Sequence, residues 1–152
     1  MVFGVFDGFH PGHRYFLTEA RARCERLVVV VALSEVVERM KKRPPLYTYE
    51  ERVARIVGFD NSLVVIPSDP GLGEWRVFKE HQPEMVFLGY DQVALGQALV
   101  DIAMPHTYIG SHYPEKFKSG LLLPVAATRT PQRSLPGPPV RGAPAPGIPP
   151  TR

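Results

Sequence analysis

The strongest constraint on the fold is a regular alternation between short apolar runs and stretches with helical spacing. Each apolar run is continuous, which is typical of strands buried on both faces of a sheet. The expected strands are 2–6, 27–33, 63–66, 85–88 and, more weakly, 106–109. The expected helices between them are 11–23, 34–40, 50–59, 74–81 and 92–104. This alternation predicts an α/β chain, a Rossmann-like doubly wound parallel sheet of about five strands with helices on both faces.

Composition changes sharply after this pattern ends. Residues 131–150 hold eight prolines with Gly, Ala and Arg among them. Proline removes backbone donors, and too few apolar residues remain there to build a core. We therefore expect residues 1–124 to form one domain and residues 125–152 to form a disordered Pro- and Arg-rich tail. Residues 136–139 could dock in an aromatic groove of a partner, although an idle tail is the favoured interpretation.

The charge follows the same division. The tail carries four arginines and no acid, which leaves 14 Lys and Arg against 15 Asp and Glu in residues 1–124. The basic isoelectric point near 9.2 therefore gives no indication of nucleic-acid binding. No apolar run approaches the roughly 18 to 20 residues of a membrane span, and no signal peptide is recognisable, so we expect a cytoplasmic protein without a membrane partner. One cysteine, Cys24, excludes an internal disulfide and a multi-thiolate metal site.

The loop after the first strand concentrates the candidate chemistry. It reads Gly4-Val5-Phe6-Asp7-Gly8-Phe9-His10-Pro11-Gly12-His13. Pro11 fits the first turn of a helix, where a missing N–H is tolerated. His10 and His13 are three residues apart and share a face at the helix start. Gly12 lets a bulky ligand approach the backbone closely.

Two imidazoles beside a helix N-terminus suit a phosphate group in transit between oxygens. The helix end offers unpaired N–H groups and positive dipole, and the rings can stabilise charge on non-bridging oxygens. The alternative is that His10 and His13 only cap a helix. A zinc site is not expected, because the remaining histidines are scattered at 81, 106 and 112.

The pattern Gly4-x-Phe6-Asp7-x-x-His10-x-Gly12-His13 resembles the signature of the cytidylyltransferase-like nucleotidyltransferases. The resemblance covers roughly residues 2–120. It implies transfer of a nucleotidyl group from CTP or ATP to a small phosphorylated acceptor, with Mg²⁺ assisting and pyrophosphate leaving. It places His10 and His13 on the reacting phosphates and Phe6, Asp7 and Gly12 in the nucleotide site. Asp7 would order the loop or the Mg²⁺ ion.

Further matches to the family lie after the second expected helix, at the start of the third, and at the end of the fourth expected strand. Lys41 is implied as the lysine that contacts the triphosphate, with a solvated basic helix end as the alternative. Arg52 would either organise the site or only pair with a carboxylate. Gly89, Asp91 and Gln92 form the turn implied to lie beside the base and ribose, and Asp91 as a helix N-cap is the competing interpretation.

The sequence Gly89-Tyr90-Asp91-Gln92 is most similar to that of the archaeal FAD synthetase branch, which adenylylates FMN. ATP is therefore favoured over CTP, with glycerol-3-phosphate cytidylyltransferase as the alternative type. Asp60 stands where family members with phosphorylated acceptors often carry a basic residue, which weakens the case for an acceptor of the glycerol-phosphate type. The resemblance is also compatible with a homodimer.

The last family motif, a Ser/Thr-rich turn that cradles the outer phosphates, is reduced here to Ser119 within Lys118-Ser119-Gly120. Ser119 is the expected remnant of that triphosphate turn. The missing part of the motif supports a second hypothesis, in which the chain is a nucleotide-binding module without turnover and the tail binds a partner.

Overall fold

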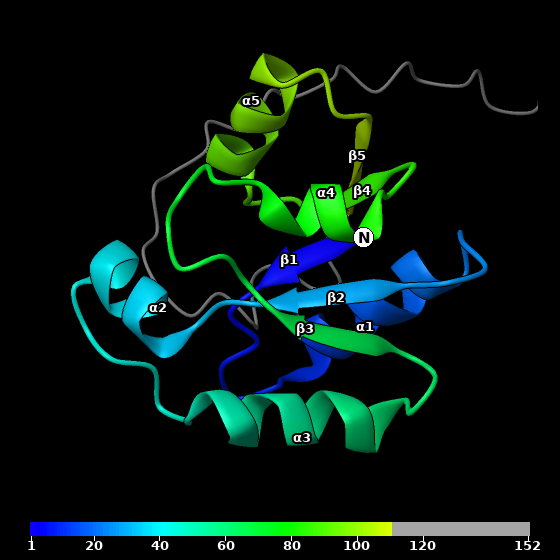
Figure 1. The fold of residues 1–152 in the computed structure, drawn as a ribbon. Coiled ribbons are helices and arrows are strands. Elements are labelled where there is room, and N and C mark those ends of the chain that lie inside the picture. The colour runs from blue at the N-terminus through cyan, green and yellow to red at the C-terminus, as the bar shows by residue number, and fades with distance from the viewer. Residues whose placement is uncertain (111–152) are drawn as a thin grey trace, which may run out of the picture. The chain divides into compact units, whose positions relative to one another are not determined.

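The computed structural model describes residues 1–110, which form a parallel sheet with helices on both faces (Figure 1). The strands are β1 (Val2–Gly4), β2 (Val28–Val31), β3 (Val64–Pro67), β4 (Val86–Gly89) and β5 (His106–Ile109). The helices are α1 (Pro11–Arg21), α2 (Ser34–Lys41), α3 (Tyr49–Phe59), α4 (Arg76–His81) and α5 (Val93–Asp101). The predicted order of strands and helices and the doubly wound α/β class are confirmed.

The strands run in the order β3-β2-β1-β4-β5, with every neighbouring pair parallel. The chain moves outward from β1 to β3 and then returns to place β4 on the other side of β1. The topological switch therefore lies between β1 and β4, where this class of sheet binds its ligands. These two strands pair only at Val2 and Phe87, whereas β1 and β2 pair over three residues.

The core lies on both faces of the sheet. Along β2, alternate valines point to opposite faces, as the strand geometry requires. Val29 belongs to the cluster that includes Leu17 of α1 and Ile56 of α3. Val30 belongs to the cluster that includes Phe78 of α4 and Leu99 of α5. The continuous apolar runs are thus explained by burial on two sides.

Several element boundaries differ from the sequence-based expectation because the backbone enters the left-handed region. The first strand ends at Gly4 rather than residue 6, since Phe6 has φ +54°. The fourth helix begins at Arg76 rather than residue 74, since Trp75 has φ +54°. The fifth helix ends at Asp101, two residues before Ala103 at φ +55°. The capping box of Thr48 and Glu51 is present at the start of α3.

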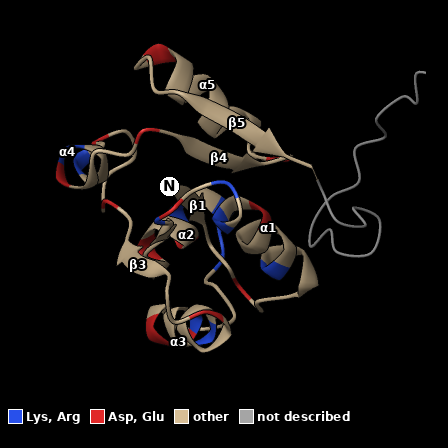
Figure 2. Cartoon of the chain, turned by 90° about the vertical axis from the view of Figure 1, so that its right-hand side faces the viewer, with Lys and Arg blue, Asp and Glu red and all other residues tan. Residues whose placement is uncertain are grey.

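The predicted tail, 125–152, and Ser119 lie outside the described residues. Within residues 1–110, none of the helices combines the length and apolar character that crossing a bilayer requires. Figure 2 shows basic and acidic positions together on α3 and on α4. This mixture agrees with the near balance of charge counted in residues 1–124.

Candidate active site

The loop between β1 and α1 is held in a tight, partly left-handed conformation. Phe6, Gly8 and Phe9 have φ values of +54°, +75° and +40°. The Phe6 ring is 1% exposed and lies over Gly4. A Cβ atom at Gly4 would approach that ring to 2.8 Å, so a glycine is needed there. The buried ring anchors the loop where the chain leaves the sheet.

His10 and His13 meet at the N-terminus of α1. His10 is the N-cap, and its Nδ1 accepts a hydrogen bond of 3.1 Å from the Gly12 N–H. Pro11 is the first residue of the helix, as predicted. The two imidazole rings stack with centroids 3.8 Å apart and an interplanar angle of 18°. The capping alternative is therefore correct for His10, but capping does not account for the stacked second ring.

His13 lies in an apolar setting. Its ring centroid is 5.4 Å from that of Phe6 and 6.3 Å from that of Phe9, and its Nδ1 is buried with no hydrogen-bond partner among residues 1–110. Burial, followed by the positive charges of His10 and Lys41, lowers the pKa of His13 to about 3. Burial also lowers the pKa of His10. A neutral imidazole has one N–H donor and one acceptor nitrogen, so His13 is suited to donate to an oxygen without carrying a charge.

Asp7 ties the β1–α1 loop to the segment between α2 and α3. Its Oδ2 accepts from the Leu46 N–H at 2.9 Å, and its Oδ1 accepts from the Tyr47 N–H at 3.2 Å. Both carboxylate oxygens thus satisfy backbone donors. Of the two roles expected for Asp7, this geometry shows the ordering of loops.

Arg52 is the buried charge of the site, with 0% exposure. Its Nη1 donates to the carbonyls of Val5 at 2.9 Å and Ala32 at 2.7 Å, which follow β1 and β2. Its Nε donates to the Tyr47 carbonyl at 3.2 Å, and its Nη2 donates to the Ser34 hydroxyl. These partners are neutral oxygens rather than a carboxylate. Of the two roles left open for Arg52, the geometry therefore supports the organisation of the site.

Arg55, which the sequence analysis did not identify, also contacts Tyr47, whose carbonyl accepts a hydrogen bond from Arg52. Its guanidinium lies 3.3 Å from the centroid of the Tyr47 ring. Arg55 stands three residues after Arg52 on α3, and that spacing places both on one side of the helix. The spacing was a usable signal, but the stacking partner lies in a loop that sequence periodicity does not position.

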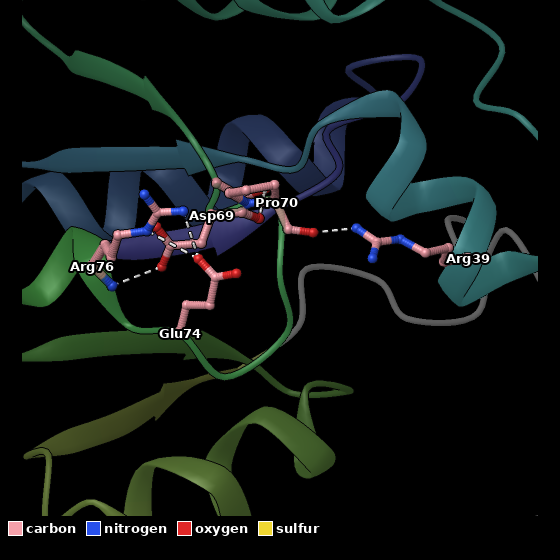
Figure 3. A network of polar contacts seen from close by, with 6 residues as sticks. Arg39, Asp69, Pro70, Glu74 and Arg76 are labelled. Carbon is pink, nitrogen blue, oxygen red and sulfur yellow. Dashed lines mark hydrogen bonds and ion pairs between the residues drawn. The ribbon is translucent and has the colours of Figure 1, made fainter.

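The end of α2 supplies the exposed cation of the site. Lys41 is the last helical residue, and it lies close enough to His13 to disfavour protonation of that ring. Arg39, two residues before the end of the helix, is engaged elsewhere, because its guanidinium donates to the Pro70 carbonyl (Figure 3). Lys41 makes no recorded hydrogen bond to residues 1–110, so it stays the candidate for outer phosphates.

The loop after β3 is fixed by its own network (Figure 3). The Asp69 carboxylate accepts from the backbone N–H of Arg76 at 2.8 Å, and the Arg76 guanidinium pairs with Glu74 at 2.7 Å. Ser68 Oγ accepts from the N–H of Leu33, the residue before α2. These contacts hold the β3–α4 loop against the carboxyl end of β2.

The turn after β4 carries the remaining candidates. Gly89 ends the strand, and Gln92 rather than Asp91 is the N-cap residue of α5, with no side-chain cap hydrogen bond. The interpretation of Asp91 as a helix N-cap is therefore wrong. Gln92 Oε1 accepts from the Gly89 N–H at 2.7 Å, and its Nε2 donates to the Phe3 carbonyl of β1 at 2.9 Å. The turn is thus joined to the strand that leads to the histidines.

A resident metal would need a cluster of ligands from the protein. Within residues 1–110, no group of three His, Cys, Asp or Glu side chains is placed to hold one. Asp7, the carboxylate expected to lie near Mg²⁺, uses both oxygens on backbone N–H groups. This donor set fits a magnesium ion that arrives on phosphates, which is how Mg²⁺ is commonly bound in nucleotide sites.

Comparison with known proteins agrees with this geometry. Residues 1–133 match the family described as cytidylyltransferase-like. The chain belongs to the cytidylyltransferase-like family. Among similar proteins, the FAD synthase of Pyrococcus abyssi is 36% identical over 94 residues, which are 60% of this chain and 62% of that protein. The FAD synthase of Natronomonas pharaonis is 37% identical over 94 residues, 59% of this chain and 61% of that protein.

The cytidylyltransferase-like fold is also found in a solved structure. The lipopolysaccharide core biosynthesis protein from Thermoplasma volcanium superposes with a TM-score of 0.61 at 27% identity, covering 74% of this chain and 93% of that one. The chain spans about three fifths of the length of the FAD synthases that it matches. These similarities show the family and the fold.

Proposed function

We propose that this chain is a nucleotidyltransferase that transfers AMP from ATP to FMN, forming FAD and releasing pyrophosphate. The observation that carries the proposal is the stacked pair of His10 and His13 at the start of α1, beside the switch point of a cytidylyltransferase-like fold. The similarity to proteins named FAD synthase supports FMN as the acceptor and ATP as the donor.

The reaction is a direct displacement at phosphorus. A phosphate oxygen of FMN attacks the α-phosphorus of ATP, and a new P–O bond forms as the bond to the β-phosphate oxygen breaks. The electron pair of the broken bond leaves with pyrophosphate. No side chain becomes covalent, so the protein contributes position and charge stabilisation.

Each site residue has a defined part in this proposal. His13 donates its N–H to an α-phosphoryl oxygen, and His10 faces the same phosphate from the helix N-cap. The N-terminus of α1 adds the positive end of its dipole. Lys41 neutralises the outer phosphates and the departing pyrophosphate. Phe6, Gly12 and Asp7 hold the loop that presents these groups.

Mg²⁺ is proposed as a cofactor carried by the triphosphate. When bound, it would offset negative charge on the phosphate oxygens. The protein side of this contact is supplied by the donors described above rather than by a dedicated set of carboxylates.

The choice of ATP over CTP rests on the Gly89-Tyr90-Asp91-Gln92 turn and on the relatives named FAD synthase. Base discrimination depends on a few hydrogen bonds to exocyclic groups. Leaving one such buried group unpaired costs about 1–3 kcal/mol, so the affinities of the two nucleotides should differ by about tenfold or more. Titration with both nucleotides and Mg²⁺ measures this difference, and equal affinities would show that the turn does not select the base.

A pyrophosphate-release screen tests the reaction itself. ATP and CTP are each combined with FMN, glycerol phosphate, phosphocholine or phosphopantetheine, and the flavin product is identified by mass. We expect release that depends on ATP and FMN together. Release without an acceptor counts as hydrolysis and not as transfer. Tight nucleotide binding without release for any pair would replace the proposal with that of a binding module, and release with CTP and another acceptor would move the chain to cytidylyl transfer.

A further inference from the structure

The ladder between β1 and β4 is interrupted at the switch point. The Phe87 N–H donates to the Met1 carbonyl at 2.9 Å, which is an ordinary rung between the two strands. Bonds in a parallel ladder recur every second residue along each strand. The next rung donated by β4 in this register would therefore run from the Gly89 N–H to the Phe3 carbonyl.

The side chain of Gln92 stands between those two groups. Its Oε1 accepts from the Gly89 N–H at 2.7 Å, and its Nε2 donates to the Phe3 carbonyl at 2.9 Å. A carboxamide has the same donor and acceptor as a peptide group. It therefore replaces one direct rung by two hydrogen bonds, and both backbone groups remain satisfied while the strands separate.

We propose that Gln92 is a positioning residue whose amide is an inserted rung that keeps β1 and β4 apart and sets the spacing across the switch point, where this class of sheet binds its ligand. That this ligand is a nucleotide rests on the proposed function. The β1–α1 loop with His10 follows one of these strands, and the turn with Asp91 follows the other. Their separation fixes how far the phosphate groups lie from the groups that face the base.

Gly89 fits this arrangement. A Cβ atom at Gly89 would lie 3.2 Å from Asp91 Oδ1 and 3.5 Å from Gln92 Oε1. The contact with Gln92 Oε1 would be an ordinary one, whereas that with Asp91 Oδ1 would be tight, so the glycine gives the Asp91 carboxylate room beside the amide. The arrangement also limits how Gln92 could contact the nucleotide, because one Oε1 lone pair and one Nε2 hydrogen are already used and only the second of each remains.

Hydrogen-bond scalar couplings provide a direct test on the full chain. In ¹⁵N,¹³C-labelled protein, we expect coupling from the Gly89 nitrogen to the side-chain carbonyl carbon of Gln92, and from Gln92 Nε2 to the Phe3 carbonyl carbon. Both should persist when MgATP saturates the protein. Absence of the couplings in the free protein, or their loss on MgATP binding, would overturn the inserted rung. The free-protein result stands even if no nucleotide binds, so failure of the proposed function is distinguishable.

Kinetic separation provides a second test. Gln92→Met keeps the length of the side chain and removes both polar atoms. We expect the KM for ATP to rise about tenfold or more, with kcat within about threefold and the KM for FMN unchanged. Gln97→Met is the matched control, because Gln97 lies exposed on the same helix. A folded Gln92→Met enzyme with the ATP KM of the control would refute the proposal.

Gln92→Glu adds a readout that loss of packing alone does not give. The carboxylate can accept from the Gly89 N–H, but its second oxygen faces the Phe3 carbonyl and repels it. The protonated acid can donate to that carbonyl and rebuild the rung. We expect the ratio of ATP dissociation constants, variant over wild type, to fall toward one as the pH is lowered from 7.5 to 4.5, because an ordinary glutamic acid protonates near pH 4.3 and repulsion by the Phe3 carbonyl favours its protonated form. A ratio that does not change with pH would contradict the proposal.

Discussion

At the scale of single residues, the two histidines have different structural roles. His10 caps α1 through Nδ1 and stacks on His13, whereas His13 has no recorded hydrogen bond to residues 1–110 through its buried Nδ1. We expect His13→Ala to lower turnover about a hundredfold or more, because removing a preorganised donor to a developing charge commonly has that effect. Steady-state kinetics of the folded variant measure the change.

The His10 prediction must separate capping from chemistry. His10→Ala should lose both the N-cap, at about 1 kcal/mol, and about a hundredfold in turnover. Asparagine is a good N-cap, so His10→Asn should recover most of the unfolding free energy while turnover stays low. The His10→Ala, His13→Ala double variant should lose less than the product of the single effects, since both rings act on one phosphate. Wild-type kinetics in a folded double variant would remove both residues from the chemistry.

The depressed pKa of His13 predicts acid sensitivity of the fold. The folded protein holds His13 neutral down to about pH 3, whereas the unfolded chain protonates it near its ordinary pKa of 6.5. Between these values the unfolded chain binds the additional proton. The unfolding free energy contributed by this site is therefore fully present above pH 6.5 and falls as the pH drops toward 3, by up to about 1.4 kcal/mol per pH unit.

Urea unfolding of wild type and His13→Gln across pH 4–7.5 isolates this contribution, because other groups titrate in both proteins. The stability of the wild type relative to the variant should decrease as the pH falls. A difference that is constant with pH would show that His13 titrates normally in the folded protein.

At the scale of elements, the site depends on ties between segments that are distant in sequence. Arg52 of α3 reaches the carbonyls that follow β1 and β2, and Asp7 holds the α2–α3 segment by two backbone N–H groups. The capping box of Thr48 and Glu51 starts α3 at Tyr49, one residue before the expected helix 50–59. The partners of Arg52 are backbone atoms brought there by the sheet, so no pattern in the sequence could name them.

The burial of Arg52 predicts a large loss of stability on substitution. Arg52→Met keeps much of the side-chain volume but leaves several carbonyls without their donor, at about 1–3 kcal/mol for each buried group. We expect the unfolding free energy to fall by about 3 kcal/mol or more. Arg52→Lys should recover only part of it, because an ammonium lacks the planar set of five donors.

Urea unfolding measures the loss, and Arg76→Met is a suitable control because Arg76 is an exposed arginine paired with Glu74 at the surface. If Arg52→Met were as stable as this control, Arg52 would not organise the site in the way described.

At the scale of the whole molecule, the sequence predicted the sheet because its physical signals are local. Continuous apolar runs such as Val28–Val31 indicate burial on two faces, and the doubly wound class then places the switch beside β1. The inserted rung could not be predicted in this way, since it joins Gln92 to Phe3, which lie 89 positions apart. The left-handed backbone conformation of Phe6 could not be predicted either, because a buried aromatic residue gives no local sign of a strand end.

The last prediction concerns the composition change near residue 125. Residues 125–152 hold eight prolines and four arginines without an acid, so the segment has few apolar side chains to bury and no carboxylate to pair with a body near charge balance. We propose that truncation after Pro124, which retains Ser119, leaves the melting temperature within about 2 °C and the ATP dissociation constant within about twofold of the full chain. Thermal unfolding and nucleotide titration of both proteins measure this. A truncated protein that melts much lower would show that the segment packs on residues 1–124, and weaker ATP binding at unchanged melting temperature would show that its arginines reach the phosphates.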